Sequence, residues 1–167
     1  MINVGPMQVY HTDITGSVIT TMPPTQGGST LNFTFETLDS LADISGTFAR
    51  DKYYVGGTAS ITVNYTELNM DDVLALFPTV TGNAVTLPIG CNARDDAISI
   101  LLRPIVCGEV SNDDTEAIFV PLVLPVPNFA TEFSLSTQRI WTIDYQILPY
   151  DPRNHNFDMI YFGQVGT

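Results

Sequence analysis

The sequence predicts a mainly β protein, an antiparallel β-sandwich or partly closed β-barrel with one short α-helix at about residues 70–77. Three observations predict it. Apolar and polar residues alternate strictly over residues 59–66, which is typical of a strand buried on one side. Several similar stretches follow one another, separated by Gly, Pro, Asn and Asp residues that favour turns. Only residues 69–77 combine a capping residue, an acidic first turn and an apolar face.

One domain over residues 1–167 is the natural interpretation of this length. With 44% apolar and 14% charged residues the chain has the composition of a globular protein. No apolar run approaches the roughly 20 residues of a membrane span, so we expect no membrane binding. The first residues lack the basic and apolar regions of a secretory signal, which predicts synthesis in a cytoplasm.

The first third of the chain predicts an N-terminal arm, two strands and two irregular stretches. Residues 1–12 form the arm or a first strand, and residues 14–20 form another strand. Pro-Pro and Gly-Gly pairs predict a loop over residues 22–28. In residues 29–38, Leu31, Phe33 and Phe35 point to one face, and Asn32, Thr34 and Glu36 point to the other.

Residues 39–57 predict a long connection, because their apolar residues follow no steady period. Loops longer than about 12 residues are usually functional or disordered. This stretch mixes apolar, aromatic and charged residues, which suits contact with a partner. The candidate contact residues are Leu41, Ile44, Phe48, Arg50, Tyr53 and Tyr54.

The alternating strand 59–66 leads directly into the helix. It buries Ala59, Ile61, Val63 and Tyr65 and turns Ser60, Thr62, Asn64 and Thr66 outward. Asn69 is the predicted N-cap, and Asp71 and Asp72 suit the positive end of the helix dipole. Pro78 ends the helix. About two turns of helix do not persist alone, so the apolar side of this helix must lie against the sheet.

The second half of the chain predicts further strands at residues 84–89, 97–106, 117–126, 132–136, 139–148 and 157–162. A polar hairpin tip covers residues 108–116, and Pro121 belongs to a group of prolines that predict bulges or sheet edges. Residues 139–148 alternate clearly. Trp141, Ile143, Tyr145 and Ile147 point inward, and Thr142, Asp144 and Gln146 point outward.

Motifs for catalysis, cofactors or metals do not stand out, so we expect no enzyme activity and no cofactor. His11 and His155 fall in segments where a solvated histidine is the simplest interpretation, and Cys91 and Cys107 suit ordinary reduced thiols. The acidic pairs lie at a helix start or in turns, where Asp is favoured anyway. The net charge of −12 and six scattered bases argue against specific binding of nucleic acid.

Three stretches taken in order resemble the major tail tube proteins of tailed bacteriophages. They are the Gly-rich strand and acidic-capped helix of residues 56–77, the preceding strand of residues 27–36, and the closing strand of residues 139–152 followed by Phe162 and Gly163. Residues 90–128 are less diagnostic. The resemblance implies a virion structural protein of the tail, made in the host cytoplasm, that forms hexameric rings stacked into a tube through which DNA leaves the capsid.

The resemblance also implies roles for particular residues. The outward rows of three strands become candidate lumen-facing residues: Asn32, Thr34, Glu36, Ser60, Thr62, Asn64, Thr142, Asp144 and Gln146. DNA would pass them without specific binding. Residues 39–57 would contact the next ring or subunit, and further partners would be other tail proteins.

Two alternatives to the tube subunit remain. One is another β-sandwich virion protein, such as a tail terminator, a tail-tip protein or a capsid decoration protein. The other is a carbohydrate- or calcium-binding module that uses the acidic turns Asp95-Asp96 and Asp113-Asp114.

Overall fold

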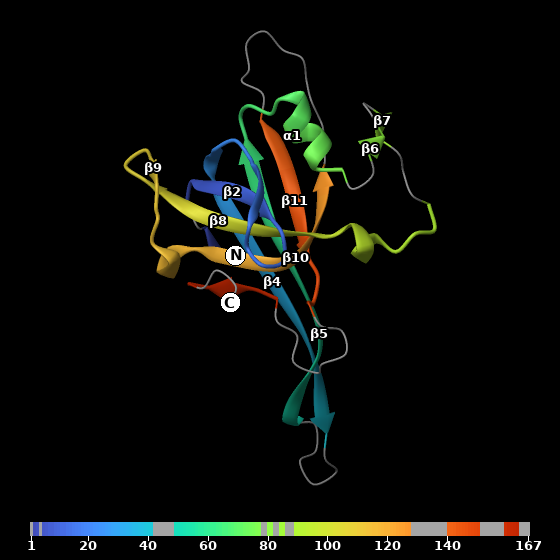
Figure 1. Cartoon of the computed structure of the whole chain (residues 1–167). Coiled ribbons are helices and arrows are strands. Elements are labelled where there is room, and N and C mark those ends of the chain that lie inside the picture. The colour runs from blue at the N-terminus through green and yellow to red at the C-terminus, as the bar shows by residue number, and fades with distance from the viewer. Residues whose placement is uncertain are drawn as a thin grey trace.

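The structure is a computed structural model that describes residues 2–3, 5–41, 49–77, 80–81, 84–85, 89–127, 140–150 and 159–163. Its described part is mainly β, with one large antiparallel sheet that does not close on itself, a separate pair of short strands and one α-helix (Figure 1). The mainly β prediction is therefore confirmed. No helix in this part of the chain is long and apolar enough to cross a membrane.

Eight strands of the main sheet follow one another in the order β1-β4-β5-β11-β10-β8-β2-β3. Short β12 pairs with β10, short β9 pairs with β8, and β6 and β7 pair with each other. The bounds are β1 Ile2–Asn3, β2 Met7–Thr12, β3 Val18–Thr21, β4 Thr25–Leu41, β5 Ala49–Tyr65, β6 Val80–Thr81, β7 Ala84–Val85, β8 Ile98–Val106, β9 Glu109–Val110, β10 Ile118–Pro127, β11 Trp141–Ile147 and β12 Tyr161–Phe162.

The sheet bends around one main hydrophobic core, to which β4 near one end of the strand order and β2 near the other both contribute. β4, β5 and β11 cross the direction of β2 and β8 in Figure 1. The alternation predicted for residues 59–66 and, as far as it is described, 139–148 is confirmed: its inward residues are buried in this core, except Trp141, which is partly buried and packs against the core. Its members are Met7, Val9, Met22, Leu31, Ala59, Ile61, Val63, Tyr65, Leu76, Ile100, Leu102, Ile118, Val120, Val123, Ile143, Tyr145 and Ile147.

Helix α1 (Met70–Ala75) lies over one end of the core (Figure 1), where Leu76 directly after it is fully buried. The predicted N-cap is confirmed: the side chain of Asn69 accepts a hydrogen bond from the amide of Asp72 at 2.8 Å. The carboxylate of Asp72 accepts one in return from the Asn69 amide at 3.0 Å. Asp72 is therefore half of a capping box as well as a charge at the helix N-terminus.

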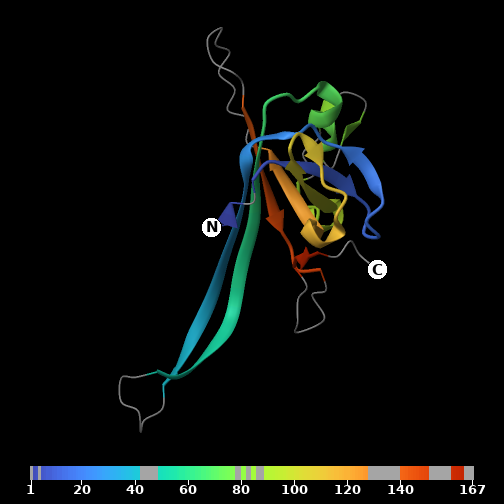
Figure 2. The same ribbon diagram turned by 90° about the vertical axis from the view of Figure 1, so that its left-hand side faces the viewer.

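The prediction of a long loop over residues 39–57 is wrong where the structure describes these residues. β4 continues to Leu41 and β5 begins at Ala49, so the two strands form a long hairpin that projects beyond the core (Figure 2). We call its projecting part, residues 35–41 and 49–57, the ribbon. At residues 35–39 and 51–57 both faces of the ribbon are exposed, so burial imposes no period-two pattern on this part of the sequence.

Smaller corrections concern local conformation. Of the two alternatives for residues 1–12, an arm or a first strand, the structure has strands: β1 pairs with β4, and β2 lies between β8 and β3. The predicted loop 22–28 contains the start of β4, with an irregular register between Thr25 and Ser29. Gly27 and Gly28 have φ values of 77° and 85°, which glycine tolerates at such a bulge.

The second half of the chain agrees with most predictions that fall on described residues. β8, β10 and β11 match the predicted strands within one or two residues. The tip 108–116 also contains β9 and a 3₁₀ turn at Asp114–Glu116. A register shift between Val120 and Val123 confirms the bulge predicted near Pro121. The predicted strand 132–136, and most of 84–89 and 157–162, lie outside the described residues or outside strands.

Candidate functional site

All nine candidate lumen-facing residues lie on one face of three neighbouring strands. Asn32 on β4 is opposite Ser60 on β5, and Ser60 is opposite Gln146 on β11. Thr62 is opposite Asp144, and Asn64 is opposite Thr142. Thr34 and Glu36 extend the same row along β4. Because the residues that alternate with them on β5 and β11 are buried, this face points away from the core; we call it the polar face.

Hydrogen bonds across strands order part of the polar face. The hydroxyl of Thr62 donates to the Asp144 carboxylate at 2.6 Å, and the hydroxyl of Thr142 donates to the Asn64 side chain at 2.9 Å. At positions 30–36, 58–64 and 142–146 the outward side chains include two carboxylates and no Lys or Arg. The polar face is therefore hydrophilic and negatively charged.

The bases whose side chains the structure describes all have partners. Lys52 forms an ion pair with Asp39 at 3.3 Å, and Arg103 forms one with Asp114. The guanidinium of Arg94 donates to the carbonyl oxygens of Pro149 and Tyr150. These three bases lie apart in the fold, so they form no positive patch for nucleic acid in the described part of the chain.

The ribbon carries an apolar stripe that begins in the core and continues beyond it. Leu31 is buried, Phe33 is half-buried, and Phe35 on the same side of β4 is 65% exposed. The rings of Phe33 and Phe35 stack at 6.2 Å, and Phe35 meets the 79% exposed Tyr54 edge to face at 5.8 Å. The exposed rings of Phe35 and Tyr54 are therefore held in place by contacts between aromatic side chains.

The predicted contact residues are only partly described. Tyr53 and Tyr54 are exposed on the ribbon, as a contact role requires. Leu41 and Arg50 lie on β4 and β5, and Ile44 and Phe48 lie outside the described residues. The sequence interpretation missed the exposed Phe35, Leu38 and Val55. For Phe35 the alternation signal was correct, but the core ends before that residue.

His11 is the clearest miss, because it is buried rather than solvated. Only 4% of it is exposed, and its Nε2 lies 3.2 Å from the hydroxyl oxygen of Tyr145. That hydroxyl lies 3.3 Å from the hydroxyl of Tyr65. Burial lowers the pKa of His11 from 6.5 to about 4, and burial also raises the pKa values of both tyrosines. The three side chains form a neutral hydrogen-bonded cluster that joins β2, β11 and β5.

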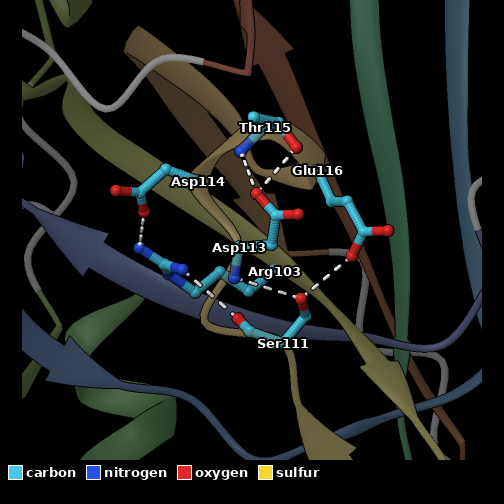
Figure 3. Close-up of polar contacts among 6 residues, drawn as sticks. All are labelled: Arg103, Ser111, Asp113, Asp114, Thr115 and Glu116. Carbon is cyan, nitrogen blue, oxygen red and sulfur yellow. Dashed lines mark hydrogen bonds and ion pairs between the residues drawn. The ribbon is translucent and has the colours of Figure 1, made fainter.

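The acidic turn at residues 111–116 uses its carboxylates internally (Figure 3). Asp113 accepts hydrogen bonds from the hydroxyl and amide of Thr115, which lower its pKa. Asp114 pairs with Arg103, and Glu116 accepts a hydrogen bond from the Ser111 hydroxyl at 2.9 Å. An arginine within the cluster reduces the attraction for a cation.

The other acidic turn also belongs to no metal-binding cluster in the part of the chain that the structure describes. Asp95 and Asp96 lie in a 3₁₀ turn capped by Asn92. Among the described residues there is no group of three or more His, Cys, Asp or Glu that could hold a metal ion. Cys91 and Cys107 are exposed free thiols.

A groove of about 970 Å³ lies at the base of the ribbon. Residues of β4 and β5 line one side, and residues 146–149 at the end of β11 line the other side together with Met159. The groove extends onto the polar face through Asn32, Ser60 and Gln146.

In comparisons with known proteins, no protein-family model matches the sequence, and no curated protein matches it.

Proposed function

We propose that this chain is a virion structural protein, a tail tube subunit whose hexameric rings stack into a tube that conducts DNA. The observation that carries the proposal is the polar face, a continuous hydrophilic surface over three strands with carboxylates and no base. The resemblance of residues 27–36, 56–77 and 139–152 to tail tube proteins supports the same assignment. Alternation alone does not distinguish a lumen from a solvated face, so assembly is the decisive property.

We also propose that the sheet is a partly closed barrel. Two contacts between the β1–β2 segment and β4 support this form: the Met7 amide donates to the Thr25 hydroxyl at 2.7 Å, and the Ser29 amide donates to the Gly5 carbonyl at 2.9 Å. The single main core, shared by β2 at one side and β4 at the other, also supports it.

Electrostatics explains how the polar face would serve a DNA channel. DNA binds proteins mainly through Lys and Arg contacts with its phosphates, and each such contact would retain the sliding strand. Like charges at close range repel instead. A wall of hydroxyl, amide and carboxylate groups therefore offers phosphates few places to bind, which suits rapid passage.

The ribbon would supply contacts between subunits. A two-stranded hairpin without a covering layer is marginally stable in water, and exposed apolar patches mark interaction surfaces. The aromatic side chains of Phe35, Tyr53 and Tyr54 would become buried against a neighbouring copy. A ring needs contacts between two different patches, and a projecting ribbon is suited to reach a distant one.

The assembly test follows purified protein by light scattering and electron microscopy over a wide concentration range. We expect rings and stacked tubes at high concentration. A protein that stays monomeric at every concentration would contradict the proposal, and discrete particles without a central channel would favour a decoration or tail-tip protein.

The lumen test reverses charge on the polar face. Glu36 and Gln146 are exposed, and replacing both by Lys leaves the Thr62–Asp144 hydrogen bond intact. We expect Glu36→Lys with Gln146→Lys to fold and form tubes but to impair DNA delivery and infectivity. The second variant, Asp144→Lys with Glu36→Lys, places a positive charge at a half-buried position of the same face and removes the Thr62–Asp144 hydrogen bond. Normal infectivity of both double variants would refute the lumen assignment.

A further inference from the structure

We propose that ribbons of neighbouring copies pair edge to edge, with the outer edge of β4 in one copy beside the outer edge of β5 in the next. This inference rests on the proposed assembly of many copies of the chain. It goes further by naming the two edges that meet and the direction in which copies follow one another.

Both edges of the ribbon lack a neighbouring strand in the described part of the chain. On its outer side β4 pairs with β1 only at Thr30 and Leu31. β5 pairs with β11 only from Ala59 to Tyr65, so residues 49–58 have β4 as their one partner strand. Each edge therefore presents backbone donors and acceptors that favour pairing with another strand.

The groove lies where another strand would continue the sheet. β11 ends at Ile147, whereas its partner β5 runs on through Gly57 and Tyr54 into the ribbon. The groove of about 970 Å³ is lined by these β5 residues and by Leu148 and Pro149 beyond β11. A strand placed in it would take the position beside β5 that β11 leaves.

Charge selects which strand of a second copy occupies this position. Beyond the polar-face residue Glu36, the ribbon part of β4 carries one acid, Asp39, and no base. The ribbon part of β5 carries Arg50 and Lys52, two of the six bases in the whole chain, beside Asp51. Pairing β4 with β4 of a second copy would place acid against acid, whereas pairing β4 with β5 places acid near base.

The ion pair within one copy already shows the contact that a second copy would repeat. Asp39 lies opposite Lys52 in the hairpin and pairs with it at 3.3 Å. The Lys52 side chain remains 65% exposed, so its ammonium has room for a second carboxylate. Because the two edges differ, each copy presents its β4 edge to one neighbouring copy and its β5 edge to the other. This contact is heterologous and propagates around a ring instead of ending at a dimer.

The test exchanges the two charges. Asp39→Lys with Lys52→Asp preserves the net charge and restores the ion pair within the hairpin, so this swapped protein should assemble by itself. A junction between a wild-type and a swapped copy places Asp beside Asp or Lys beside Lys. We expect about fivefold fewer mixed junctions than random mixing gives, because each mixed junction replaces a weak Asp–Lys attraction by a like-charge repulsion of similar size.

Energy transfer between two dyes measures the mixing. In both proteins Cys107→Ser leaves the exposed Cys91 as the single labelling site, and dissociated copies are mixed before assembly. Low salt should give the strongest sorting, and about 1 M salt should abolish it, because salt screens exposed charges. Sorting that disappears with salt supports the proposed pairing.

Each other outcome overturns the proposal. Random mixing in intact rings would refute ribbon pairing while the tube function stands, and preferential mixing would indicate pairing of like strands, β4 against β4 or β5 against β5. A wild-type protein that never assembles would refute both.

If the swapped protein misfolds, single cysteines replace it as the test. Asp39→Cys and Lys52→Cys are introduced into separate copies in which Cys91 and Cys107 are replaced by serine. A short thiol crosslinker should then join the Asp39→Cys protein to the Lys52→Cys protein. Crosslinked products that contain the Asp39→Cys protein alone would overturn the pairing.

Discussion

Acidification should destabilise the fold through His11. The imidazole is buried beside the Tyr145 hydroxyl, and its pKa is lowered from 6.5 to about 4 by desolvation. Among the described groups packed around it, β11 and β5 contribute the neutral phenols of Tyr145 and Tyr65, and the carboxylate of Asp72 on α1 acts electrostatically on Tyr65. The neighbouring strand β3 carries no titratable group, and the residue of β8 that lies opposite His11 is the apolar Ile100.

The direction of the effect follows from proton binding. Between pH 6.5 and pH 4 the unfolded chain binds a proton at this histidine and the folded chain does not, so stability falls as the pH falls. Above about pH 7 the contribution is fully present, and below pH 4 both states are protonated and the loss is complete. A pKa lowered from 6.5 to about 4 corresponds to a total loss of roughly 3 kcal/mol, of which about 2 kcal/mol is lost by pH 5.

Urea unfolding of the monomer at pH 7.5, 6 and 5 measures this loss, with the fluorescence of the single Trp141, which packs against the core, as the signal. The variant His11→Gln retains a hydrogen-bonding side chain but does not titrate. The difference between wild type and variant removes the contribution of the carboxylates, which the two proteins share. His155→Gln controls for the loss of one imidazole.

The decisive quantity is how that difference changes with pH. We expect wild type to lose about 2 kcal/mol more than His11→Gln between pH 7.5 and pH 5. Parallel stability curves, or a folded-state imidazole that titrates near 6.5 by nuclear magnetic resonance, would refute the argument from burial.

Two further predictions concern local structure, and denaturant unfolding at pH 7.5 measures both. Asp72→Ala should lower the free energy of unfolding by about 1 kcal/mol, because it removes a capping-box hydrogen bond. The control Asp71→Ala removes only an exposed charge of the same helix turn. Equal losses of stability in the two variants would argue against the capping box. Gly57→Ala should cost about 1–3 kcal/mol, because its Cβ would lie 2.9 Å from a backbone oxygen of β4. Gly56→Ala should cost less, since the atom it approaches, at 3.3 Å, ends a flexible side chain; the reverse order would contradict this reasoning.

Local patterns sufficed for the strands that have one buried face. Ile61, Val63, Ile143 and Tyr145 alternate with polar residues because each strand meets the core on one side, so the period of the sequence records the environment. The cap at Asn69 is similarly local, since it involves residues only three positions apart. The members of the polar face could be listed from these patterns, and the structure adds their register.

The ribbon and the burial of His11 depended on tertiary structure. Where β4 and β5 leave the core both faces meet solvent, and after residue 38 of β4 and before residue 58 of β5 the sequence carries no period from which a strand could be recognised. His11 looked like a solvated residue because its partner Tyr145 lies 134 positions away, and only folding brings the two together.

The sequence by itself thus determined the mainly β class, the inward and outward faces of the core strands, and the start of the helix. Each of these depends on residues a few positions apart. Tertiary structure alone decided where the core ends, which polar side chains become buried, and which strand edges stay open. These properties depend on contacts between distant segments, which no short stretch of sequence encodes.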